Sequence, residues 1–221
     1  MFFSGQIFSG NPSLTNIKKT PRMDKKSISK ELGVELKDFL VLIKHPLSSV
    51  KDKSYQQMKI TLEVLSDFIK NTNLKVIGIR PNTDPGSYDI LKAIEESNNE
   101  KIIFFKNLPR NLFINLMRHT KALVGNSSMG ILEAPFYKLP VVNIGERQKG
   151  RLNAGNVEFV DYNKNVMLKA LHKAVFDTDY REFFNKIDNP YGKGDSEKII
   201  VSFLKKLDLS DKNWLIKKKM V

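Results

Sequence analysis

Short apolar segments alternate along this chain with longer segments whose apolar residues recur at helical spacing, and this alternation limits the possible folds most strongly. Residues 39–43 form an apolar run without a polar interruption, as expected of a strand buried on both faces of a parallel sheet. Between residues 55 and 71 the apolar residues recur three or four positions apart, which predicts an amphipathic helix. The repeated alternation predicts an α/β fold with a mostly parallel sheet.

The remaining elements follow the same pattern. Further strands are predicted at residues 75–79, 102–105, 122–124, 141–144 and 157–160. Further helices are predicted to begin near Asp24, Ser87 and Pro109, and to cover residues 164–176, 179–186 and 195–207. We predict a linker at residues 1–38, one domain at 39–207 and a basic C-terminal tail at 208–221.

The residues that follow the predicted strand at 122–124 have the pattern of a phosphate-binding turn. Ser127 and Ser128 lie in a short polar segment before a helix. A turn of this kind directs several backbone N–H groups and a helix N-terminus at one place, where an anion binds well. Glu133 follows about one and a half helical turns later, where a carboxylate can accept hydrogen bonds from sugar hydroxyls. The segment therefore predicts a nucleotide-sugar site.

Other polar and charged residues also come just after predicted strands. In parallel α/β sheets, ligands bind beyond the carboxyl ends of the strands. We therefore expect one shared cleft that contains His45, Asn82, Leu108, residues 126–129 and Arg147.

The composition limits the class of protein. With 37 Lys and Arg against 24 Asp and Glu, the formal net charge is +13. The chain shows neither basic residues interleaved with aromatic ones nor zinc-finger spacing, so we do not expect a nucleic-acid partner. It has no cysteine, no apolar run near the roughly 18 residues that span a bilayer and no secretion signal at its start. We expect a cytoplasmic protein without a membrane partner.

Two motifs carry a resemblance to a known family. Residues 125–135 read GNSSMGILEAP and residues 142–151 read VNIGERQKGR. Together they resemble the hydrolysing UDP-N-acetylglucosamine 2-epimerases, in particular the bacterial branch of the sialic-acid pathway. Weaker matches lie, in order, at residues 10–14, 44–46, 80–84 and 189–192, and the resemblance covers about residues 8–207. It implies a Rossmann-like parallel sheet flanked by helices, the second half of a glycosyltransferase-B fold.

The resemblance also implies roles for individual residues. Ser127 and Ser128 would hold the β-phosphate, Glu133 would accept hydrogen bonds from the ribose hydroxyls, and Arg147 would contact the UDP.

Three further roles follow from the same resemblance. Asn82 and Leu108 would line the uracil and ribose side of the pocket. His45 would be the acid–base or diphosphate-binding group that this half contributes.

The implied reaction converts UDP-N-acetylglucosamine to N-acetylmannosamine and UDP, by elimination of UDP and addition of water. In the family, the acid–base carboxylates come mainly from the first domain, which these residues do not resemble. We therefore expect the chain alone to be inactive, and we expect no cofactor and no metal. The implied partners are a UDP-sugar, a separate chain that carries the first domain, and a second copy in a homodimer.

Two other interpretations stay open. The chain could be the C-terminal domain of a UDP-sugar glycosyltransferase, although the loop RQKGR at residues 147–151 is unusual for that class. Alternatively, it could be a non-catalytic UDP-binding product of a split or truncated gene.

Overall fold

The computed structural model describes residues 7–207 and 210 and divides into two compact units. One unit is Thr20–Pro190, and the other combines Met1–Lys19 with Tyr191–Val221. The predicted basic tail at 208–221 lies outside the described residues, apart from Ser210.

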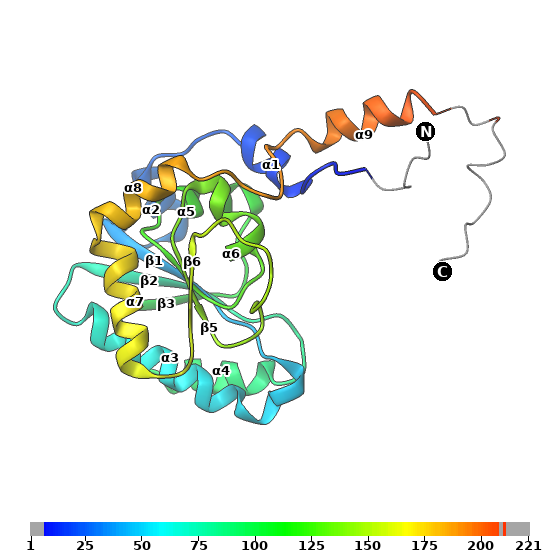
Figure 1. Ribbon diagram of the computed structural model, residues 1–221. Helices are drawn as coiled ribbons and strands as arrows, with labels where there is room; N and C mark the ends of the chain where they lie inside the picture. The colour runs from blue at the N-terminus through cyan, green and yellow to red at the C-terminus, as the bar shows by residue number, and fades with distance from the viewer. Residues whose placement is uncertain (1–6, 208–209, 211–221) are drawn as a thin grey trace. The chain divides into compact units, whose positions relative to one another are not determined.

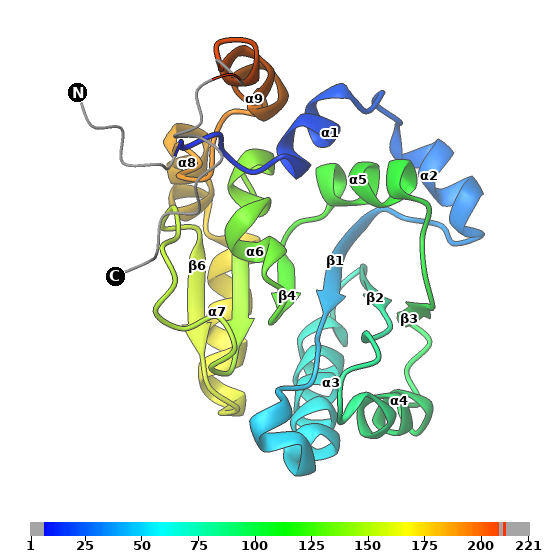
Figure 2. The same cartoon turned by 90° about the vertical axis from the view of Figure 1, so that its right-hand side faces the viewer.

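A parallel six-stranded sheet forms the centre of the unit Thr20–Pro190 (Figure 2). Its strands lie in the order β3-β2-β1-β4-β5-β6, and every neighbouring pair is parallel. The order reverses between β1 and β4, which is the position where Rossmann-like sheets bind their ligands. The parallel α/β fold is confirmed, with strands β1 (Asp38–Ile43), β2 (Leu74–Ile79), β3 (Ile102–Phe105), β4 (Leu123–Gly125), β5 (Val141–Ile144) and β6 (Val157–Val160).

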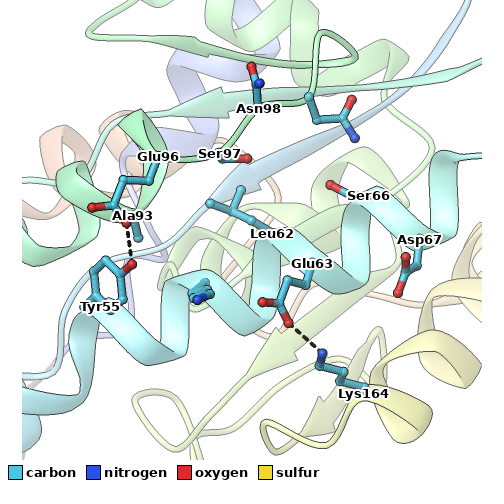
Figure 3. Close-up of a pocket in the computed structure, with 12 residues that line it drawn as sticks. Tyr55, Leu62, Glu63, Ser66, Asp67, Ala93, Glu96, Ser97, Asn98 and Lys164 are labelled. Carbon is cyan, nitrogen blue, oxygen red and sulfur yellow. Dashed lines mark hydrogen bonds and ion pairs between the residues drawn. The ribbon is translucent and has the colours of Figure 1, made fainter.

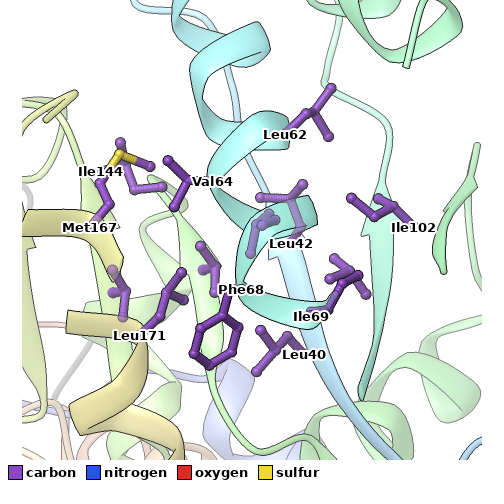
Figure 4. Close-up of a cluster of buried hydrophobic side chains, with 14 of the residues drawn as sticks. Leu40, Leu42, Leu62, Val64, Phe68, Ile69, Ile102, Ile144, Met167 and Leu171 are labelled. Atoms are coloured by element: carbon purple, nitrogen blue, oxygen red, sulfur yellow. The ribbon is translucent and has the colours of Figure 1, made fainter. Parts of the chain in front are cut away.

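Helices cover both faces of this sheet (Figure 1). On one face, buried residues of α3 (Ser54–Ile69), α4 (Ser87–Glu95) and α7 (Lys164–Phe176) form a single apolar cluster with the strands (Figure 4). On the other face, α2 (Lys25–Leu32) and α5 (Arg110–His119) contribute to a second cluster. A 3₁₀ helix, η1 (Ser48–Lys53), precedes α3, and α8 (Thr178–Lys186) follows α7.

The helix after the polar turn is shorter than predicted. The α-helix α6 covers only Met129–Leu132, and a 3₁₀ helix, η2, follows at Ala134–Tyr137. Pro135 explains the break, because it has no N–H to donate to the carbonyl of Ile131 and its ring collides with that carbonyl in a regular helix. Glu133 therefore lies at the junction of two short helices rather than on a continuous one.

The compact unit begins at Thr20, so it includes part of the segment 1–38 that was predicted as a linker. As predicted, a helix begins next to Asp24, whose carboxylate accepts a hydrogen bond from the Ser27 N–H at 2.7 Å. Ile28 on that helix is fully buried in the second apolar cluster. Residues 20–38 thus belong to the core of this unit.

The other unit joins two segments that are distant in sequence. It contains α1 (Ser13–Lys19) and α9 (Ser196–Leu204), which contact each other. The Asn11 N–H donates to the Tyr191 carbonyl at 2.7 Å, and Lys19 forms an ion pair with Glu197 at 2.8 Å. The motifs noted at residues 10–14 and 189–192 therefore meet in space through Asn11 and Tyr191.

An Ile28→Ala variant tests whether α2 is part of the core. We expect it to lower the free energy of unfolding by about 3 kcal/mol, because it removes a fully buried side chain and leaves a cavity. Urea unfolding followed by circular dichroism measures this change. Lys26→Ala, an exposed change on the same helix, is the matched control. Equal stabilities of the two variants would show that α2 does not support the core.

Candidate functional site

The predicted site residues all follow carboxyl ends of the strands, and parallel strands place these ends at one edge of the sheet. The loops that position them follow five neighbouring strands, β3, β2, β1, β4 and β5. In strand order, these residues are Leu108, Asn82, His45, the pair Ser127 and Ser128 with Glu133, and Arg147.

Asn126 connects three of these loops. Its side-chain oxygen accepts from the His45 N–H at 2.7 Å, and its side-chain amide donates to the His45 carbonyl at 2.8 Å. The Asn126 carbonyl accepts from Arg147 Nη1 at 3.4 Å and from Gln148 Nε2 at 3.1 Å. Asn126 is buried, so these bonds satisfy polar groups that water does not reach.

His45 is half-buried and held by its neighbours. Its Nδ1 accepts a hydrogen bond from the Asn82 N–H at 3.3 Å. Burial lowers the pKa of His45, and the nearby charge of Arg147 lowers it further. The imidazole is therefore neutral at pH 7, and because Nδ1 is an acceptor, the proton is on Nε2. The structure thus brings His45, Asn82 and Arg147 together.

The turn that contains Ser127 and Ser128 depends on a glycine before it. Gly125 has a φ of +126°, and a Cβ at this position would lie 2.0 Å from the Ile43 carbonyl oxygen. Only glycine permits this close approach of β4 to β1 together with this backbone angle. Both serines are partly exposed at the start of α6, and Ser127 Oγ accepts from the Met129 N–H at 3.4 Å.

Glu133 forms a separate part of the site. Its side chain is only 14% exposed, and its Oε2 lies 3.4 Å from Nη2 of Arg110 at the start of α5. Leu108, two residues before Arg110, packs against the second apolar cluster. Within residues 7–207, no hydrogen bond or ion pair joins Glu133 directly to His45 or Arg147.

The sequence interpretation missed Lys44, which is 2% exposed. Its Nζ donates to Tyr162 Oη at 2.7 Å and lies 4.9 Å from the centre of that ring. Among residues 7–207 it forms no ion pair. Burial lowers the pKa of the Lys44 ammonium to about 7. The signal in the sequence was a lysine directly after the apolar run at residues 39–43.

A larger cavity in the described part of the chain lies away from the predicted site residues. A groove of about 500 Å³ lies between α3 and α4 (Figure 3). Three of its charged groups have partners: Glu63 pairs with Lys164 at 2.6 Å, and Glu96 accepts from the Tyr55 hydroxyl. None of the predicted site residues lines it.

The described residues contain neither a membrane-spanning helix nor a cluster of metal ligands. No helix among them is long and apolar enough to cross a membrane. Within the same residues, no group of three His, Cys, Asp or Glu side chains is placed to hold a metal ion.

Comparison with solved structures identifies the class of fold. The UDP-N-acetylglucosamine 2-epimerase from Neisseria meningitidis, solved with UDP-GlcNAc bound, aligns with a TM-score of 0.69 and 18% identity, over 90% of this chain and 55% of that chain. The chain therefore has the Rossmann-like architecture of one half of a glycosyltransferase-B fold.

Comparison of sequences identifies the family. A Campylobacter jejuni protein named GDP/UDP-N,N'-diacetylbacillosamine 2-epimerase (hydrolyzing) is 35% identical over 168 residues, which are 74% of this chain and 42% of that protein. A Legionella pneumophila UDP-N,N'-diacetylbacillosamine 2-epimerase (hydrolyzing) is 30% identical over 202 residues, 90% of this chain and 51% of that protein. Residues 5–205 match the family described as UDP-N-acetylglucosamine 2-epimerase. This chain belongs to that family, and it spans about half the length of the curated relatives it matches.

A Lys44→Met variant tests the cost of the buried ammonium. The pKa of Lys44 is about 7 in the folded chain and 10.5 when it is solvated, so the unfolded chain binds more protons between these values. The free-energy penalty for burying the charged Lys44 side chain is greatest at and below pH 7, and it disappears as the pH rises towards 10.5. We expect Lys44→Met to be more stable than the wild type at pH 7, by on the order of 1–4 kcal/mol.

The difference should decrease steadily in urea unfolding experiments from pH 7 to pH 10. A difference that does not depend on pH, or a variant less stable than the wild type throughout, would contradict this account of Lys44.

Proposed function

We propose that this chain supplies the UDP-binding half of a hydrolysing UDP-N-acetylglucosamine 2-epimerase, which converts UDP-N-acetylglucosamine to N-acetylmannosamine and UDP. The observation that carries the proposal is the Asn126 network, which joins the loops of His45 and Arg147 beside the serine turn. This network lies at the reversal of strand order, where ligands of such sheets bind.

The polar turn and the cations around it suit a diphosphate. Ser127 and Ser128 provide hydroxyl and backbone N–H groups, and Arg147 provides a guanidinium that makes charge-assisted bonds to phosphate oxygens. Among residues 7–207, Arg147 makes one side-chain hydrogen bond, a long one of 3.4 Å to the Asn126 carbonyl. Its side chain is thus available to a ligand at little cost in broken contacts.

Glu133 is placed to recognise the ribose. Its carboxylate is largely buried and lies near one cation, Arg110, at 3.4 Å. A carboxylate in this position accepts two hydrogen bonds from a vicinal diol, and hydrogen bonds to charged acceptors stabilise a complex by roughly 1.5–3 kcal/mol each. Leu108 and Asn82 would border the uracil and ribose from the ends of β3 and β2.

His45 would assist departure of the diphosphate. Its neutral imidazole has the proton on Nε2, because Nδ1 accepts from the Asn82 N–H. Nε2 can therefore donate to an oxygen of the leaving UDP as the bond between this oxygen and C1 of the sugar breaks. A diphosphate next to the ring would raise the pKa of His45 and strengthen that donation.

The reaction needs further acid–base groups. A base takes the proton from C2, the C1–O bond breaks to release UDP, and a glycal remains. Water then adds its hydroxyl to C1, and a proton returns to C2 from the opposite face. His45 alone cannot perform these proton transfers on both faces of the sugar. We propose that the carboxylates come from the other half of the fold, on a separate chain.

A non-catalytic UDP-binding chain is the second candidate function. In that case the chain binds UDP and releases no sugar. A glycosyltransferase would instead form a glycoside, which product analysis separates from free N-acetylmannosamine.

Calorimetry with UDP tests the proposed site. We expect binding by the wild-type chain, and an affinity at least about tenfold lower for Glu133→Ala because two hydrogen bonds to a charged acceptor disappear. Ser127→Ala/Ser128→Ala should weaken binding to a similar degree. Glu31→Ala, an exposed acid on α2, is the control and should bind like the wild type. If the folded wild-type chain does not bind UDP, the proposal is wrong.

A further inference from the structure

A second cavity lies beside the proposed UDP site and shares Asn126 and Arg147 with it. Its volume is about 340 Å³. The walls come from η1, the start of α3, the loop after β5 and the residues after β6. Its polar lining includes Lys53, Gln57, Asn126, Arg147 and Tyr162.

Two cations line this cavity, and a third lies close to it. Arg147 and Lys53 line it directly. Behind its wall, Lys44 donates to Tyr162 Oη at 2.7 Å, and the Tyr162 hydroxyl donates to Gln57 Oε1 at 3.0 Å. Lys44 is 2% exposed and forms no ion pair within residues 7–207. A buried ammonium without a carboxylate is costly, and an anion in the neighbouring cavity would compensate it.

The acidic groups at this cavity do not cancel these cations. Glu146 lines it, but its carboxylate lies 3.5 Å from Lys149 Nζ and is 70% exposed. Asp161 lines it as well and is exposed. The titratable group next to Lys44 in sequence is His45, which is neutral at pH 7 because burial and Arg147 lower its pKa.

We propose that this cavity binds a phosphate-class anion between Lys53, Arg147 and Tyr162, with the buried Lys44 supplying positive charge through the Tyr162 hydroxyl. It is a second anion-binding site, separate from the turn of Ser127 and Ser128, because neither serine lines the cavity. Two cations around one space match the several acceptor oxygens of a phosphate, and the single proton of the Tyr162 hydroxyl would turn from Gln57 Oε1 to the anion.

Proton uptake is the property that sets this site apart. Near pH 8 part of Lys44 is uncharged, because burial lowers its pKa to about 7. An anion close to Tyr162 favours the ammonium form, so binding takes up protons from the buffer. An anion that makes no contact with the Lys44–Tyr162 pair would bind without this uptake by Lys44.

Calorimetry with inorganic pyrophosphate at pH 8 tests the proposal, in two buffers that differ in ionisation enthalpy. The protein is the full chain with Ser127→Ala/Ser128→Ala, which removes the two hydroxyl groups of the other proposed phosphate-binding turn. We expect pyrophosphate to bind with uptake of a fraction of a proton. Adding Lys44→Met should lower the affinity at least about tenfold and abolish the proton uptake. Tyr162→Phe should also lower both the affinity and the proton uptake.

Lys59→Met is the matched control, since it removes an exposed lysine that lines the distant groove between α3 and α4. It should change neither affinity nor proton uptake. The proposal is overturned if the double serine variant does not bind pyrophosphate, or if Lys44→Met keeps both the affinity and the uptake. Pyrophosphate binding in a chain whose wild type fails to bind UDP would contradict the proposed function and leave this site intact.

Discussion

The pair of hydrogen bonds between the Asn126 side chain and the backbone of His45 is the interaction on which the site depends. Asn126 is 3% exposed, so its amide cannot turn to water instead. In an interior of low dielectric, such a pair is costly to leave incomplete. It fixes the loop after β1 against the turn after β4, and the Asn126 carbonyl fixes Gln148 in the loop after β5. Packing of the sheet brings the loops near each other, and this amide sets their relative positions.

The charges around this amide are arranged before any ligand is present. Arg147 lowers the pKa of His45, and Lys44 is buried close by without a carboxylate partner. Beyond the turn, Glu133 forms an ion pair with Arg110. Charges held in place by the fold need little reorganisation when a ligand binds. The cost appears in stability instead, since neutral groups would pack in the same positions without a desolvation penalty.

The strands could be predicted from the sequence because runs such as 102–105 and 157–160 are rich in apolar and β-branched residues and are bounded by polar ones. The same pattern predicted which edge of the sheet carries the predicted site residues, because these residues come just after the strands. The sequence did not reveal the contribution of α2 to the core, because Ile28 is one apolar residue among lysines. Asn126 and Lys44 were missed as structural partners, since their contacts join residues 81 and 118 positions apart.

The hydrogen bond between the Asn11 N–H and the Tyr191 carbonyl has a consequence for protein engineering. It holds together the two stretches of chain that lead into and out of the unit Thr20–Pro190. A segment of chain whose two ends lie side by side can be inserted into a loop of a host protein. Residues 11–191 form such a segment, because this hydrogen bond joins their ends. This segment contains the sheet and is therefore suited to domain insertion. A ligand bound at the proposed UDP site would then act on the host through the two neighbouring ends of the insert.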